Sequence, residues 1–204
     1  MGADLYESYC GSILATAALG VAAASSIGAG ESAIRFLAAP MVLAGLGIFL
    51  SILGIFAVRT KEGASMKQLM GALGRGVNGS TVFIAIIAAL VCYYLLGDLA
   101  IVNWWGIWLA IVTGLFAGVV IGKSTEYYTS YDYKPTRGIA EQGETGPATV
   151  IIAGVAEGLK STWGALVTII VAIILAYGFA GGFEVMPLGL YGVGIAAVGM
   201  LATL

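Results

Sequence analysis

Two acidic residues near the start of the chain are the best candidates for ion chemistry. Asp4 and Glu7 lie three residues apart where a long apolar run begins, and a helix would place them on one face together with Ser8 and Gly11. A charged residue at the centre of a membrane-spanning helix costs at least about 2.5 kcal/mol, so such residues often serve proton or cation transfer. The same carboxylates could instead complement the dipole in the first turn of a helix. The residues alone favour this structural interpretation, because nothing in them shows how deep the pair lies.

A second charged pair, Glu157 and Lys160, has the same spacing and lies near the start of another apolar run. On one helix face the two charges could neutralise each other at the membrane boundary. We therefore predict a structural ion pair here rather than a transport site.

The elements that carry these residues are predicted to cross a membrane. Of 204 residues, 60% are hydrophobic and 10% charged, and the mean hydropathy is +1.00, which excludes an ordinary soluble domain. A bilayer core of about 30 Å requires about 20 apolar residues as helix. Six stretches come near that length, the third being short and the fifth long: 5–24, 36–58, 81–96, 105–122, 150–179 and 188–204. The predicted fold is all-α, a polytopic transmembrane helix bundle of six membrane-spanning helices that form one region over residues 1–204.

Composition also excludes several classes of function. The formal charge of −2 provides no basic stripe for phosphates, so no nucleic acid partner is expected. The chain has no histidine, and its two cysteines, Cys10 and Cys92, are far apart. This pattern gives no zinc, haem or catalytic histidine signature and no disulfide framework, so each cysteine is expected to be a small apolar filler. The first ten residues lack the basic region of a signal peptide.

The cations indicate the orientation of the chain, because cytoplasmic loops carry an excess of Lys and Arg. Seven of the nine cations fall after the second or fourth span, namely Arg59, Lys61, Lys67, Arg75, Lys123, Lys134 and Arg137. The loops on the other side hold Glu31, Asp98 and Glu184 against a single Arg35. The amino end is therefore predicted to lie in the cytoplasm.

Regularly spaced glycines and two polar segments are further features of the sequence. Small residues at every fourth position allow close helix packing in lipid, and we prefer this interpretation to a glycine-lined path for Gly114, Gly118, Gly122, Gly154 and Gly158. The glycine-rich residues 71–81 lack the lysine of a phosphate-binding loop and are predicted to be a flexible connection. The polar, tyrosine-rich residues 123–149 are predicted to be an ordered loop with a function of its own.

Four sequence blocks together resemble one family of membrane proteins. They are GADLYESY at 2–9, TEYYTSYDYKPTRGIAE at 125–141, TGPATVIIAGVAEGLKST at 145–162 and LYGVGIAAVGML at 190–201. Their order and spacing resemble the membrane-bound, ion-translocating inorganic pyrophosphatases, and the EYYTS and TGPAT blocks are specific to that family. The chain resembles the sixth to eleventh helices of these proteins.

The resemblance implies a multi-pass prokaryotic membrane protein, a homodimer that hydrolyses pyrophosphate with Mg²⁺, in some members with K⁺, and moves H⁺ or Na⁺. It implies that Asp4 lies in the ion path and that Glu7 belongs to the ion gate. Two carboxylates on one face can share a proton or ligate sodium, so the resemblance favours ion translocation over the dipole interpretation. Glu126 is expected to hold its loop, and Lys160 matches a lysine that is frequent in the family.

The chain also departs from the family pattern. The aspartate and lysine clusters that hold pyrophosphate and Mg²⁺, the lysine that partners the gate and the position that decides K⁺ dependence are expected outside these residues. Without a cluster of metal ligands and a positioned water, the chain alone is predicted to be inactive. Because the last span ends within its apolar run, we expect further polypeptide on both sides.

Two other functions remain open. The chain could be a catalytically inactive membrane fragment or an assembly module without the hydrolytic site. A secondary transporter is disfavoured, because no internal inverted repeat is visible. The transported ion is also open, since YESYCGSI resembles the sodium-pumping, K⁺-dependent branches while proton pumps carry a glutamate there as well.

Overall fold

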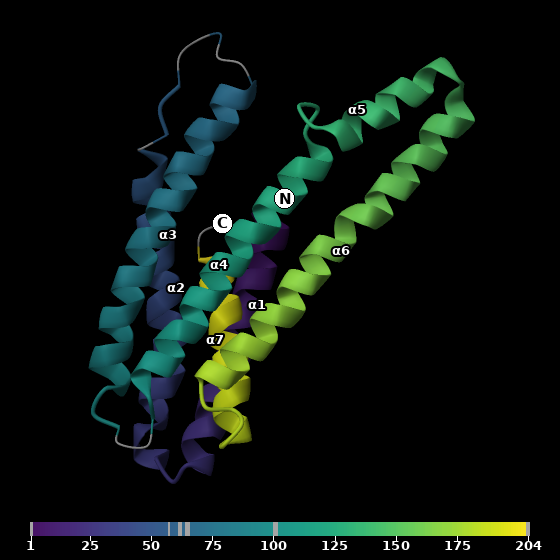
Figure 1. Cartoon of the computed structure of the whole chain (residues 1–204). Coiled ribbons are helices and arrows are strands. Elements are labelled where there is room, and N and C mark those ends of the chain that lie inside the picture. Colours follow the sequence, from purple (N-terminus) through teal and green to yellow (C-terminus); the bar gives the residue numbers. More distant parts are fainter. Residues whose placement is uncertain (1, 57, 61–62, 64–65, 100–101, 203–204) are drawn as a thin grey trace. The chain divides into compact units, whose positions relative to one another are not determined.

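The described residues of the chain are mainly helical. The computed structural model describes residues 2–56, 58–60, 63, 66–99 and 102–202, and no strand occurs among them (Figure 1). The α-helices are α1 (Gly2–Ser26), α2 (Ala33–Ile55), α3 (Met66–Leu96), α4 (Trp104–Thr129), α5 (Lys134–Glu141), α6 (Pro147–Phe179) and α7 (Met186–Leu201). Two short 3₁₀ turns, η1 (Gly30–Ser32) and η2 (Gln142–Glu144), precede α2 and follow α5. The predicted all-α class is confirmed.

The helices form two compact units. The first unit comprises Met1–Phe116 and Ala172–Leu204, and the second comprises Ala117–Val171. Helices α4 and α6 each contribute to both units. The first unit holds α1, α2, α3 and α7 complete, and therefore contains both predicted gate carboxylates.

Within the described residues, five helical stretches are long and apolar enough to cross a membrane. They contain α1, α2, α3, α4 and α6. Helix α7 is apolar but has only 16 residues, which at 1.5 Å per residue is about 24 Å. The prediction of six spans is thus met in five helices of full length and one shorter apolar helix.

The third span differs from its prediction. It was expected over 81–96, with a flexible connection at 71–81, but α3 is helical from Met66 to Leu96. Glycine destabilises a helix interior by about 1 kcal/mol relative to alanine, yet tertiary packing supplies most helix stability in proteins. Here Gly76 allows close packing: a Cβ at this position would lie 2.7 Å from Val58 Cγ2 and 3.2 Å from the Gly54 carbonyl oxygen. The glycine-rich segment is therefore helical and packs closely on the end of α2 at Gly76.

The predicted loop at 123–149 is also largely helical. Helix α4 continues to Thr129, and α5 and η2 together occupy residues 134–144. The turn between α4 and α5 is held by two side chains that donate to main-chain oxygens. Thr136 Oγ1 lies 3.2 Å from the Tyr128 oxygen, and Arg137 Nε lies 2.9 Å from the Tyr131 oxygen. This part of the chain is ordered, as predicted, but by helices and not as a loop.

Glycine packing is confirmed at one predicted position and not at three others. A Cβ at Gly114 would overlap the carbonyl oxygen of Ala196 on α7, so α4 and α7 approach through this glycine. In the second unit, a Cβ at Gly122, Gly154 or Gly158 would meet no atom of that unit within 4 Å. Regular spacing of glycine thus identified one helix contact and three open positions.

The structure agrees with part of the prediction of which loops lie on the same side of the membrane. Arg35 Nη1 lies 3.8 Å from Asp98 Oδ2, so the turn before α2 and the turn after α3 lie at the same end of the first unit. Both turns were predicted on the side opposite the cations. Among the predicted cations, Lys61 lies outside the described residues and the side chain of Lys67 is not described. The cytoplasmic position of the amino end stays a prediction.

Candidate functional site

Helix α1 positions the two predicted gate carboxylates. It is helical from Gly2 to Ser26, with Asp4 in its first turn, so Asp4 and Glu7 lie one turn apart on one face, as predicted. Both side chains are exposed within this chain, and so is Ser8. The Ser8 carbonyl accepts a hydrogen bond from Ser12 Oγ at 2.8 Å, which directs the Ser12 hydroxyl toward this end of α1.

The opposite face of α1 is the packed one. Its buried residues are Thr16, Ala17, Gly20, Ala23 and Ala24. At Gly20 a Cβ would come within 2.9 Å of both the Phe36 carbonyl oxygen on α2 and the Tyr191 ring on α7. The orientation of α1, and with it the direction of its acidic face, is therefore fixed by close contact with α2 and α7.

The exposed face of α1 continues beyond the carboxylates as a row of small residues. Gly11, Ala15, Ala18, Ala22 and Ser25 are all exposed and recur at intervals of three or four, which places them on one side of a helix. Small residues allow another helix backbone to approach closely in lipid. From the sequence this face was predicted only as far as Gly11, although the same spacing of small residues is visible further along the helix.

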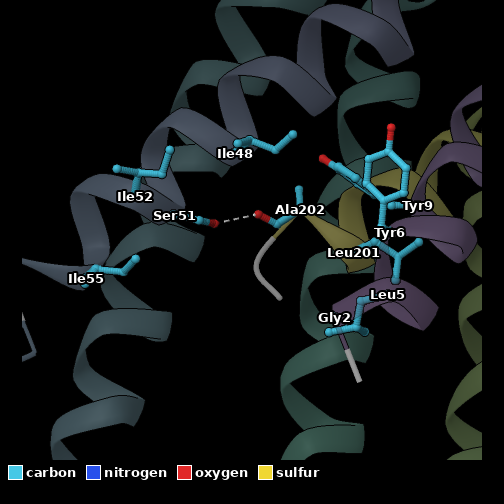
Figure 2. A pocket seen from close by; sticks show the side chains of 10 residues that line it. All are labelled: Gly2, Leu5, Tyr6, Tyr9, Ile48, Ser51, Ile52, Ile55, Leu201 and Ala202. Atoms are coloured by element: carbon cyan, nitrogen blue, oxygen red, sulfur yellow. Dashed lines mark hydrogen bonds between the residues drawn. The ribbon is translucent and has the colours of Figure 1, made fainter.

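A cavity of about 320 Å³ lies beside α1, α2 and α7 within the first unit. Its lining is mainly apolar, and α1 contributes Gly2, Leu5, Tyr6 and Tyr9 (Figure 2). Figure 2 also shows the hydrogen bond of 3.2 Å from Ser51 Oγ on α2 to the carbonyl oxygen of Ala202. Neither Asp4 nor Glu7 lines this cavity, so the candidate ion site and the cavity lie on different faces of α1.

The described residues do not fit a resident divalent metal site. Among them, no group of three or more His, Cys, Asp or Glu side chains could hold a metal ion, whereas Mg²⁺ prefers an octahedral set of oxygen ligands. Binding of Mg²⁺ is therefore not assigned to these side chains.

Cys92 is buried, as a small filler would be, but Cys10 is exposed, which corrects the expectation for that residue.

The charged pair on α6 forms as predicted. Lys160 Nζ lies 2.8 Å from Glu157 Oε1 within the second unit, with side chains 63% and 23% exposed. The pair links adjacent turns of one helix and contacts no other charged residue among those described. The role expected for the Glu126 side chain stays a prediction, since the contact seen at this residue is the main-chain bond from Ser130 N to Glu126 O at 2.9 Å.

Helices of this length and apolarity, with two carboxylates on one face, define an all-α, polytopic membrane protein with a candidate ion site. The family model for inorganic H⁺ pyrophosphatase matches residues 1–204. The chain therefore belongs to the inorganic H⁺ pyrophosphatase family.

Similar proteins carry the names of ion pumps. The chain is 53% identical over 208 residues to the "Putative K(+)-stimulated pyrophosphate-energized sodium pump" of Bacteroides thetaiotaomicron, covering 100% of the chain and 28% of that protein. It is 38% identical over 204 residues to the "K(+)-insensitive pyrophosphate-energized proton pump" of Methanosarcina mazei, again covering 100% and 28%. It is 32% identical over 219 residues to the "K(+)-stimulated pyrophosphate-energized sodium pump" of Thermotoga maritima, covering 98% and 29%. The chain thus spans little more than a quarter of the length of these relatives.

Proposed function

We propose that this chain supplies the ion path of a primary pump that couples pyrophosphate hydrolysis to movement of H⁺ or Na⁺ across a membrane. The observation that carries the proposal is the position of Asp4 and Glu7 on one exposed face of α1, in a chain matched by the family model from end to end.

The two carboxylates would bind the transported cation between them. Their oxygens can share one proton or contribute ligands to Na⁺. An unneutralised pair of carboxylates in a membrane is costly, which favours uptake of a cation. A change in their surroundings that stabilises the free carboxylates would release it. Moving one charge against 100 mV requires about 2.3 kcal/mol, which is within the reach of phosphoanhydride cleavage.

Hydrolysis itself is assigned to residues outside this chain. Pyrophosphate and Mg²⁺ would be bound there, and K⁺ would act there in a potassium-dependent member. The proposal also includes a homodimer in a prokaryotic cell membrane, with the amino end of α1 in the cytoplasm. Support for this orientation comes from the cations within residues 59–75 and 123–137 of the sequence.

Both sodium and proton pumps occur among the relatives. The identity is 53% to a relative named as a sodium pump and 38% to one named as a proton pump. This difference supports Na⁺ as the transported ion ahead of H⁺. The discriminating experiment uses membrane vesicles that contain the native polypeptide and measures ²²Na⁺ uptake and acidification in parallel after addition of pyrophosphate. Pyrophosphate-dependent uptake of either ion is expected, and hydrolysis without movement of either ion would contradict the pump assignment.

The alternative is an inactive membrane fragment or an assembly module. A blot of source membranes with antibodies against residues 127–137 separates the two possibilities. A band several times larger than 20.8 kDa is expected for the pump. A band at 20.8 kDa would assign the chain to the alternative.

A further inference from the structure

A second cavity lies between α2 and α3, away from the candidate ion site. Its volume is about 190 Å³, and its walls combine apolar side chains with gaps left by glycine: Leu50, Leu53, Gly54, Gly76, Gly79, Ser80 and Phe83. At its rim Leu53 is 49% and Phe83 61% exposed. The two helices run side by side here (Figure 1), and the cavity is a groove on the outer surface of the pair.

Two arginines flank one end of this groove. The contact between Val58 and Gly76, in which a Cβ on the glycine would lie 2.7 Å from Val58 Cγ2, brings the end of α2 against α3. Arg59 directly follows Val58, and Arg75 directly precedes Gly76. The backbones of Arg59 and Arg75 therefore each lie one residue from the Val58–Gly76 contact, at the Gly76 end of the groove.

Both arginines are available to an anion. Each is exposed, and neither forms an ion pair within the described residues. Arg75 Nε donates to the Gly71 carbonyl oxygen at 3.3 Å. The two terminal nitrogens of its planar, permanently charged guanidinium group can still donate to an anion.

The distance from Arg75 to the end of α3 is close to the thickness of the hydrocarbon core. Arg75 lies roughly 20 residues before Leu96, the last residue of α3, which corresponds to about 30 Å along the helix axis. That distance is the thickness of the hydrocarbon core. If Leu96 lies at one boundary, Arg75 lies at the other, where headgroups begin, while the groove from Gly76 to Phe83 extends into the acyl region.

We propose that the groove between α2 and α3 binds an anionic phospholipid, with one acyl chain along Gly76, Gly79 and Phe83 and the phosphate at Arg59 and Arg75. The small residues leave enough width for the acyl chain, and the arginines provide the preference for a headgroup with a net negative charge. This site does not depend on the transported ion or on hydrolysis.

The test is native mass spectrometry of the native polypeptide, released from nanodiscs that contain equal amounts of phosphatidylglycerol and phosphatidylcholine with identical acyl chains. Each cation near a membrane surface contributes roughly a fivefold preference for anionic lipid, so about 25-fold is expected for both. The variant Arg59→Gln/Arg75→Gln should lose this preference and still retain phosphatidylcholine. Lys123→Gln/Lys134→Gln, which removes two exposed cations elsewhere, should keep it.

A groove-filling variant tests the acyl site separately. A Cβ at Gly79 meets no atom within 4 Å, so Gly79→Leu can enter the groove without a clash at the backbone and should remove both lipids. Gly74→Leu is the matched control, because Gly74 lies on the same helix with the same free space but does not line the groove. An unchanged preference in the double arginine variant, or normal lipid retention in Gly79→Leu, would overturn the proposal. So would a wild-type protein without preference, as expected if another helix covers the groove.

Discussion

Tyr191 of α7 and Phe36 of α2 join two helices that lie far apart in the sequence. The Tyr191 hydroxyl donates a hydrogen bond of 3.1 Å to the Phe36 carbonyl oxygen, and the two rings meet edge to face with centroids 5.4 Å apart. Both residues are fully buried, and Gly20 of α1 lies against the same two groups. This three-helix contact fixes the rotation of α1, so it determines where the acidic face of that helix points.

Removing the Tyr191 hydroxyl should destabilise the first unit. A hydrogen bond of this kind contributes about 1 kcal/mol, and the Phe36 carbonyl would lose its buried donor in Tyr191→Phe. We expect a lower midpoint of thermal unfolding in detergent, with the edge-to-face contact of the rings retained. Tyr94→Phe is the control, because Tyr94 is 76% exposed. Equal midpoints for the two variants would show that the buried hydroxyl adds no stability.

Alanine substitutions at two glycines of α4 should have opposite effects. In Gly114→Ala the new methyl group meets the Ala196 carbonyl oxygen, which belongs to helix backbone and cannot move aside cheaply, so the midpoint of unfolding should fall. In Gly122→Ala the methyl group enters open space within its unit, and the better helix propensity should stabilise by up to about 1 kcal/mol. The same unfolding assay compares them. A fall of similar size in both would mean that Gly122 is also a packed position.

The fold class followed from the sequence because apolar length is a strong signal, whereas the helix ends required packing information. At 71–81 the glycines suggested a flexible connection. The structure instead packs Gly76 against Gly54 and Val58, and this contact stabilises helix where local propensity is poor. Likewise, the spacing of Gly114 and Gly122 is regular in sequence, but only a neighbouring backbone distinguishes a close contact from open space.

The shared face of the two candidate carboxylates was predictable from the sequence, whereas the surroundings of that face were not. The i, i+3 spacing was enough to place Asp4 and Glu7 on one face, and the same rule identified the ion pair of Glu157 and Lys160. The groove beside Arg75 was missed, because its walls come from two helices whose register no local pattern reveals. Long-range contacts of this kind depend on the whole bundle.

The ion pair on α6 should be dispensable. Lys160 is 63% exposed, and exposed pairs contribute little, because solvent screens them and ordering the side chains costs entropy. We expect Glu157→Gln, Lys160→Gln and the double variant to unfold at the wild-type midpoint and to transport at the wild-type rate. A double-mutant cycle measures the coupling. Loss of transport in both single variants would assign the pair to the ion path instead.

Asp4→Asn should abolish transport. The substitution keeps the size of the side chain but removes its charge and its ability to exchange a proton, so the cation loses one of its two anionic partners. Pyrophosphate-driven ²²Na⁺ uptake and acidification are measured in vesicles at matched protein levels. Glu31→Gln is the control, because it also neutralises an exposed carboxylate, beyond the far end of α1 in η1. Wild-type uptake in Asp4→Asn would contradict the assignment of this residue.

Glu7→Ala should change which ion is moved or uncouple transport from hydrolysis. Sodium requires several oxygen ligands, so a site that retains only Asp4 should bind it poorly, whereas one carboxylate can still carry a proton. We therefore expect the ratio of ²²Na⁺ uptake to phosphate release to fall, while phosphate release continues. Glu7→Asp keeps a carboxylate on the same face of α1 and should retain more sodium transport than Glu7→Ala. If both variants move the same ion at the wild-type rate per phosphate released, Glu7 serves only the first turns of its helix, and the dipole interpretation holds for that residue.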